Sequence, residues 1–191
     1  MSHEWWIWLA AGLAVLLVWR RFTRRRPPSR ASLTRARRHR EKRDQALQVV
    51  VALQHRPRCA RALTLLRTMD PWAFEELVLL AFKRRGYRIY PNRRYSHDGG
   101  SDGAVVKGGR LWLIQAKRYR GYIRPSHLAN FCRLIKRRGC RGFFCHTGYL
   151  GPKAEVIIQA HPKVTVLGAQ QLVQMLTRAA RAPRALHQAR R

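Results

Sequence analysis

The order of the expected helices and strands predicts a mixed α/β domain, with helices on both faces of a central sheet. Residues 70–86 have the pattern of a helix, strands follow it, and helices and strands then alternate to about residue 180. Two of the strands, Asp102–Val106 and Arg110–Tyr119, are joined through a Gly-Gly pair, which predicts a hairpin. The second strand is apolar on both faces, so we expect it at the centre of the sheet.

The first helix begins at Asp70, an N-cap residue, with proline at the first helical position. Apolar residues recur at helical spacing from Phe74 to Ala81, and Gly86 ends the helix. The other expected elements are, in chain order, a strand at 87–90, a helix at 125–139, a strand at 141–147, a helix at 151–161, a strand at 163–167 and a helix at 169–180.

The composition is strongly basic: 40 of the 191 residues are Lys or Arg and nine are Asp or Glu, a formal net charge of +31. Charge of this size predicts binding to a polyanion, either nucleic acid or anionic lipid. The four cysteines contain no CxxC pair, and no histidine pattern completes a zinc site. We therefore expect reduced thiols at Cys59, Cys132, Cys140 and Cys145.

An uncharged run of 15 residues, WWIWLAAGLAVLLVW, occupies positions 5–19. It is shorter than the roughly 20 residues that usually span a bilayer. Tryptophans at both ends suit the two interfaces, however, and Arg20 and Arg21 can reach the headgroups. A signal peptide would carry its basic residues before the apolar run. We therefore expect residues 1–19 to form a single-pass transmembrane helix in the inner (cytoplasmic) membrane, with the N-terminus outside and the domain in the cytoplasm.

Between the anchor and the domain, residues 20–43 are basic and lack hydrophobic periodicity, which predicts a linker that is disordered when free. Helical spacing returns over residues 44–68, which we expect to form a helical spacer that either packs on the domain or stands apart from it. The domain then covers residues 69–177, and residues 178–191 form a basic tail.

The hairpin also predicts a site. If its two glycines form a two-residue turn, the register places Asp102 opposite Gln115, and Lys117 shares a face with Gln115. A carboxylate, an amide oxygen and an ammonium group fit metal-dependent hydrolysis, because Mg²⁺ (or Mn²⁺) prefers oxygen ligands and retains waters. Lys117 would hold or deprotonate the attacking water. Aspartates in a glycine-rich loop are also typical of plain turns, and it is the Gln-x-Lys pattern on a central strand that favours a site.

Three segments in this order, FEELVLLAFKRRGY, DGGSDGAVV and WLIQAKRY, resemble the Mrr-like branch of the PD-(D/E)XK restriction endonucleases. The resemblance covers residues 69–176. It implies a restriction-endonuclease-like three-layer domain and an Mg²⁺-dependent DNA endonuclease that hydrolyses phosphodiester bonds, without a small-molecule cofactor. It also implies catalytic roles for Glu75, Asp102, Gln115 and Lys117, of which the first three hold the metal. Gln115 stands where most of the superfamily has Glu or Asp.

Neighbouring side chains have secondary expected roles. We expect Glu76 to be solvated or to stabilise its helix, although a shift of one residue would exchange its role with that of its neighbour. Asp98 would position the glycine-rich loop or contact the metal shell, and His97 would lie on a surface loop. His146 and Thr147, at the end of a strand, are expected in packing or in a turn.

DNA phosphates are the expected partners of basic side chains that flank the site: Arg118, Arg120, Arg124, Lys136, Arg137, Arg138 and Lys153. A monomer would nick DNA, whereas cutting both strands needs a homodimer or two events. One alternative is an inactive nuclease-fold protein that tethers DNA to the membrane, but a tether needs none of the four site residues. A basic RNA-binding protein is a further alternative, but the aromatic stacking motifs of common RNA modules are missing.

Overall fold

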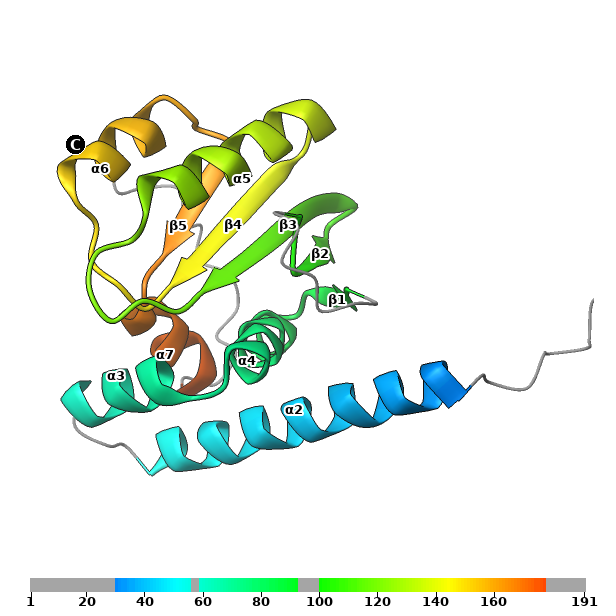
Figure 1. The fold of residues 1–191 in the computed structure, drawn as a ribbon. Helices are drawn as coiled ribbons and strands as arrows, with labels where there is room; N and C mark the ends of the chain where they lie inside the picture. The colour runs from blue at the N-terminus through cyan, green and yellow to red at the C-terminus, as the bar shows by residue number, and fades with distance from the viewer. Residues whose placement is uncertain (1–29, 56–58, 93–99, 178–191) are drawn as a thin grey trace, which may run out of the picture. The chain divides into compact units, whose positions relative to one another are not determined.

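The computed structural model describes residues 30–55, 59–92 and 100–177 (Figure 1). The chain divides into two compact units, residues 1–37 and 38–191, and the second contains every described element except the first turns of α2. The elements are α2 (Arg30–Gln54), α3 (Cys59–Thr68), α4 (Pro71–Arg84), β1 (Arg88–Pro91), β2 (Gly103–Lys107), β3 (Arg110–Lys117), α5 (Pro125–Arg138), β4 (Arg141–His146), α6 (Pro152–Gln159), β5 (Val164–Leu167) and α7 (Ala169–Thr177).

The five described strands form one mixed sheet in the order β1-β2-β3-β4-β5. The pairs β1–β2 and β2–β3 are antiparallel, and the pairs β3–β4 and β4–β5 are parallel. Helices α5 and α6 cover one face of the sheet, and α4 and α7 cover the other (Figure 1). The expected three-layer α/β domain is therefore confirmed, with β3 at the centre.

The two faces of β3 enter different apolar clusters. Ile114 and Ala116 pack in the cluster that contains α4 and α7, whereas Leu113 packs in the cluster built on α5 and β4. A strand buried on both sides explains why the sequence shows no polar face over this segment. Apart from Arg110 next to the turn, its polar residues are Gln115 and Lys117, towards the strand end.

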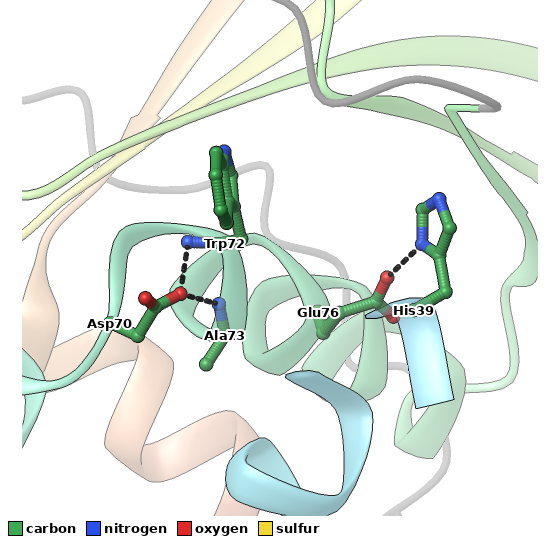
Figure 2. A network of polar contacts seen from close by, with 5 residues as sticks. All are labelled: His39, Asp70, Trp72, Ala73 and Glu76. Carbon is green, nitrogen blue, oxygen red and sulfur yellow. Dashed lines mark hydrogen bonds and ion pairs between the residues drawn. The ribbon is translucent and has the colours of Figure 1, made fainter. Parts of the chain in front are cut away.

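Helix α4 begins as the sequence predicts. The Asp70 carboxylate accepts hydrogen bonds from the backbone N–H groups of Trp72 (2.9 Å) and Ala73 (3.1 Å), which have no partner inside the helix (Figure 2). Proline follows at the first helical position, where no N–H is needed. The cap fixes the start of the helix, and therefore the direction in which each later side chain points.

The region before the domain differs from the expectation. Helix α2 begins at Arg30, so the second part of the expected disordered linker, residues 30–43, is helical. Ala46, Val50 and Leu53 of this helix are buried in the same core as α4 and α7. Once these residues are held, extending the helix towards its N-terminus adds one hydrogen bond per residue without a new nucleation cost. Residues 30–43 are therefore helical despite their lack of hydrophobic periodicity, because later residues of the same helix are buried in the core.

The expected helical spacer packs on the domain, because Ala62 and Leu66 of α3 join the same core as the residues of α2. Within the described ranges, no helix is both long and apolar enough to cross a bilayer. The apolar run at 5–19 and the basic tail at 178–191 lie outside these ranges, as do His97 and Asp98.

Helix α5 packs closely on β4 at Gly142. A Cβ atom at this position would lie 2.5 Å from Ile135 Cδ1 and 2.7 Å from Phe131 Cζ, and both side chains are buried. Gly142→Ala should therefore push α5 away from the sheet and lower the free energy of unfolding by about 1–3 kcal/mol, the usual cost of overpacking. The urea midpoint of unfolding measures this change.

Gly121→Ala is the matched control, because a Cβ there meets no atom within 4 Å. It should leave the urea midpoint nearly unchanged. Equal midpoints for the two variants would contradict the close packing of α5 on β4.

Candidate active site

The hairpin between β2 and β3 has the predicted register. Lys107 pairs with Arg110, and the two residues between them, Gly108 and Gly109, have φ values of 54° and 70°. Positive φ at both central positions is the requirement of a type I′ turn, which matches the twist of the strands it joins. The register runs on to Gly103, which pairs with Ile114 at the end of the hairpin away from the turn.

Asp102 lies just before β2 and is held on both sides. Its N–H donates to Ile114 O (2.8 Å), and its carbonyl oxygen accepts from the N–H of Asn92 (3.3 Å). Its carboxylate oxygen Oδ2 accepts from the N–H of Ala116 at 2.7 Å. The carboxylate is therefore fixed against β3 between Gln115 and Lys117, as the predicted register requires.

Gln115 carries a buried polar atom without a partner. Its side chain is 4% exposed, and its Nε2 donates to Gly100 O at 3.1 Å. Because a carbonyl can only accept, this bond determines which end of the amide is nitrogen. The other end, Oε1, is buried and accepts no hydrogen bond. An unsatisfied buried acceptor costs about 1–3 kcal/mol, so this oxygen is suited to a ligand that the chain itself does not supply.

Glu75 on α4 completes the cluster. Burial and the nearby Asp102 carboxylate raise the pKa of Glu75 from 4.5 to about 8, and the attraction of Lys117 only partly opposes them. The glutamate therefore interacts electrostatically with both residues, although they lie just before β2 and at the end of β3. The four residues that the sequence singles out are brought together by three elements.

Glu76 corrects one expectation. It is buried rather than solvated, and its Oε1 lies 3.0 Å from Nδ1 of His39 on α2 (Figure 2). Consecutive residues of a helix point about 100° apart, so Glu75 and Glu76 cannot both face the site. The structure places Glu75 near Asp102 and Lys117, and Glu76 against His39 of α2.

The donor set suits a hard cation. Among the described residues, no three His, Cys, Asp or Glu side chains form a cluster that could hold a metal. Glu75, Asp102 and the unpaired Oε1 of Gln115 instead supply two carboxylates and one amide oxygen. Oxygen donors of this kind fit Mg²⁺ or Mn²⁺, which keep several waters, better than zinc.

Thr147 joins the loops that follow β3 and β4. Its Oγ1 accepts from the N–H of Tyr119 and donates to the carbonyl oxygen of Tyr119, both at 2.8 Å. These two hydrogen bonds to the backbone of Tyr119 confirm the turn role expected for Thr147. His146, the last residue of β4, is buried beside Lys117 in the parallel register, and burial lowers its pKa.

A pair of side chains near Lys117 was not expected from the sequence. Tyr119 Oη lies 2.8 Å from Nδ1 of His127, in the first turn of α5. Burial raises the pKa of Tyr119 to about 12. Burial, followed by the positive charges of Arg124 and Lys117, lowers the pKa of His127. A neutral imidazole that accepts a hydrogen bond from the phenol fits both the raised pKa of Tyr119 and the lowered pKa of His127. The two residues are eight positions apart in a loop and a helix, so no periodic pattern connects them.

The seven expected DNA-binding residues fall into three groups. Arg120, Arg124 and Lys153 are exposed in segments that follow the carboxyl ends of β3 and β4, at the same end of the sheet as Lys117. Lys136, Arg137 and Arg138 are also exposed, but in the last turn of α5. That helix returns from the end of β3 to the start of β4, and its 14 residues extend for about 20 Å. The three basic residues in its last turn therefore lie at the opposite end of the sheet from Lys117.

Arg118 is turned inwards. Its guanidinium donates to the carbonyl oxygen of Arg67 at 2.7 Å, and its Nε is buried. Arg67 in turn donates from Nε to the carbonyl oxygen of Thr147 at 3.0 Å. These contacts tie the end of α3 to the loops after β3 and β4. The structure therefore gives Arg118 a structural contact where the sequence predicts a phosphate contact.

Comparisons with known proteins show the family of the domain. The family model for the catalytic domain of Mrr, described as a restriction endonuclease, matches residues 66–176, more than half of the chain. Two solved structures are similar. One is the MspJI restriction endonuclease in complex with a 27-mer oligonucleotide, with 26% identity, 61% of this chain and 30% of that chain covered, and a TM-score of 0.49. The other is the DNA modification-dependent restriction endonuclease AspBHI, with 20% identity, 70% and 35% covered, and a TM-score of 0.32.

The chain thus spans about a third of the length of each of these two proteins. No curated protein matches it. The family match contains Glu75, Asp102, Gln115 and Lys117, the residues that the fold brings together. The chain therefore belongs to the Mrr-like restriction endonuclease family.

Proposed function

We propose that the chain is a metal-dependent endonuclease that hydrolyses phosphodiester bonds in DNA. The observation that carries the proposal is the meeting of Glu75, Asp102 and an unpaired Gln115 oxygen beside Lys117. Two carboxylates that repel each other and a buried acceptor without a donor both reduce the stability of the fold. A divalent cation relieves both costs at once. A protein that only tethers DNA gains nothing from such a cluster.

The proposed roles follow from the chemistry of the side chains. Glu75, Asp102 and Gln115 would hold Mg²⁺ or Mn²⁺, which supplies a polarised phosphate oxygen and a water of lowered pKa. Lys117 holds or deprotonates the attacking water and offsets the charge that develops at phosphorus. The water oxygen bonds to phosphorus and loses a proton, one P–O ester bond breaks, and the leaving oxygen takes up a proton from the solvent. Arg120, Arg124 and Lys153 contact the DNA phosphates at this end of the sheet.

The proposal includes the position of the enzyme in the cell. The apolar run at residues 5–19 supports a single-pass anchor that holds the domain at the cytoplasmic side of the inner membrane. One domain carries one such cluster and cuts one strand at a time, so cleavage of both strands requires a homodimer or two successive events.

Nicking of supercoiled plasmid by the full-length protein tests the reaction. The parent should nick the plasmid in Mg²⁺ or Mn²⁺ and not in EDTA. Asp102→Asn keeps an oxygen that can accept from Ala116 but removes the charge, and Lys117→Ala removes the ammonium group. Each should lower the nicking rate by about 100-fold or more, the usual effect of losing a catalytic acid–base or electrostatic group.

Lys163→Ala is the control for the loss of one positive charge, because Lys163 is exposed before β5, at the opposite end of the sheet. It should nick like the parent, and all four proteins should shift DNA equally in a gel. A parent that shifts DNA but leaves it intact in both metals would favour the tether.

Stability without metal should reveal the proton on Glu75. Its pKa is about 8 in the folded protein and near 4.5 when exposed, so the folded state holds an extra proton between these values. The stability that this protonated group contributes is complete below pH 4.5 and is lost as the pH rises to about 8. Glu75→Gln stays neutral. Its melting temperature should therefore rise relative to the parent across this range and level off above it.

Thermal melts in EDTA at several pH values make the measurement. The same substitution at Glu155, which is exposed on α6, controls for the loss of a carboxylate in general. A difference between Glu75→Gln and the parent that stays constant from pH 4.5 to pH 8 would show that Asp102 and burial do not hold the proton on Glu75.

Cell fractionation tests the anchor. The full-length chain should sediment with membranes and resist a high-salt wash, which removes proteins held by charge alone. Deleting residues 2–19 should move it to the soluble fraction. Deleting the basic tail, residues 178–191, removes positive charge but should leave it with the membranes. Release of the full-length chain by salt would contradict a transmembrane anchor.

A further inference from the structure

Two exposed tyrosines lie side by side beyond the carboxyl ends of β3 and β4. Tyr122 is 70% exposed and Tyr149 is 54% exposed. Their ring centroids are 6.0 Å apart, with 60° between the ring planes. Tyr122 is in the segment between β3 and α5, and Tyr149 is in the segment between β4 and α6. Unlike the other exposed tyrosine of the described residues, Tyr90, these two form a ring pair, and both rings are accessible to a ligand.

The backbone under the two rings is fixed. The N–H of Tyr149 donates to Gly121 O, and the N–H of Ile123 donates to Tyr149 O, both at 3.0 Å, which extends the parallel pairing of β3 and β4. Gly148 lies between the two loops, where a Cβ would be 2.5 Å from Gly121 O. The segments therefore touch directly, and the rings are presented without a cost of ordering a loop.

The surroundings of the rings are positively charged. The Arg67 guanidinium lies over the Tyr149 ring, 4.9 Å from its centroid. Arg120, Arg124 and Lys153 are exposed in the adjoining segments, against a single acid, Glu155. Stacking rings bordered by cations are the pattern that binds unpaired nucleobases together with their phosphates. The positive charge disfavours a cationic partner and favours a polyanion.

The tyrosine pair lies near the proposed catalytic lysine. Tyr122 follows Lys117 by five residues, so the two Cα atoms are at most about 18 Å apart. The Thr147 contacts to Tyr119 lie between them and hold this segment in place. A base stacked on Tyr122 would therefore belong to a nucleotide close to the phosphate at the site.

We propose that Tyr122, supported by Tyr149, stacks an unpaired nucleobase and so gives the domain a preference for single-stranded DNA next to the cut site. The inference rests on the proposed function, because that function makes DNA the substrate. In an intact duplex both faces of each base are covered by the neighbouring pairs, and only an unpaired base can offer a face to the ring. Flaps, gaps and opened strands provide such bases.

Equilibrium binding in EDTA tests the inference without cleavage. The full-length protein is titrated into a fluorescent single-stranded oligonucleotide and into the duplex of the same sequence. Tyr122→Ala should weaken single-strand binding by about 5- to 100-fold, the effect of losing one stacked base, and duplex binding by less than about twofold. Tyr122→Phe keeps the ring and should bind both probes as the parent does.

Tyr90→Ala is the matched control, because Tyr90 is 48% exposed on the edge strand β1. It should leave single-strand binding unchanged. The salt dependence separates stacking from charge: Tyr122→Ala should keep the parent slope of log K against log[salt], and Arg124→Ala should reduce it by about one. Melting temperatures of the tyrosine variants show that they remain folded.

The outcomes separate this inference from the proposed function. Equal effects of Tyr122→Ala on single strand and duplex, or no effect on either, overturn the stacking role while DNA binding stands. The stacking role is also overturned if Tyr122→Phe binds the single strand as weakly as Tyr122→Ala does. If the parent binds neither probe, DNA is not its substrate, and the proposed function fails instead.

Discussion

The site depends on the register of one hairpin. Gly108 and Gly109 adopt left-handed backbone angles that other residues reach only with strain, and this turn sets which residues of β2 and β3 face each other. The site lies at the other end of the same hairpin. A slip of one residue would turn Gln115 and Lys117 to the opposite face and separate Asp102 from Ala116. Two glycines remote from the chemistry therefore determine where its polar groups meet.

Local electrostatics at the site run against the charge of the whole protein. A net charge of +31 would by itself favour ionised carboxylates and lower their pKa, yet the pKa of Glu75 is raised to about 8. Exposed charges are screened by salt over roughly 10 Å, whereas burial and the Asp102 carboxylate act within the site. Burial and the Asp102 carboxylate therefore affect the pKa of Glu75 more than the net charge does. A strongly basic surface can therefore coexist with a buried acidic pair, because salt screens the distant charges and not the close ones.

Local patterns predicted much of this structure, and long-range contacts account for what they missed. The Asp70 cap, the Gly-Gly turn and the doubly apolar β3 each depend on residues close in sequence, and all three are confirmed. Helix α2 extends to Arg30 because its distant end is buried on the domain, and Glu76 pairs with a histidine 37 residues away. The inward turn of Arg118 likewise depends on Arg67, which no periodicity connects to it.

Neighbouring residues of the segment from Lys117 to Tyr122 have different contacts. Lys117 interacts with the acidic pair, Arg118 ties the loops to α3, Tyr119 is held by Thr147, and Tyr122 faces solvent. Contacts to phosphates and stacking on a base both ignore base identity. A domain that uses these two contacts selects DNA by structure, through the presence of an unpaired base, rather than by sequence. In the proposed enzyme, the five residues from Lys117 to Tyr122 would limit how far the stacked base can lie from the cut site.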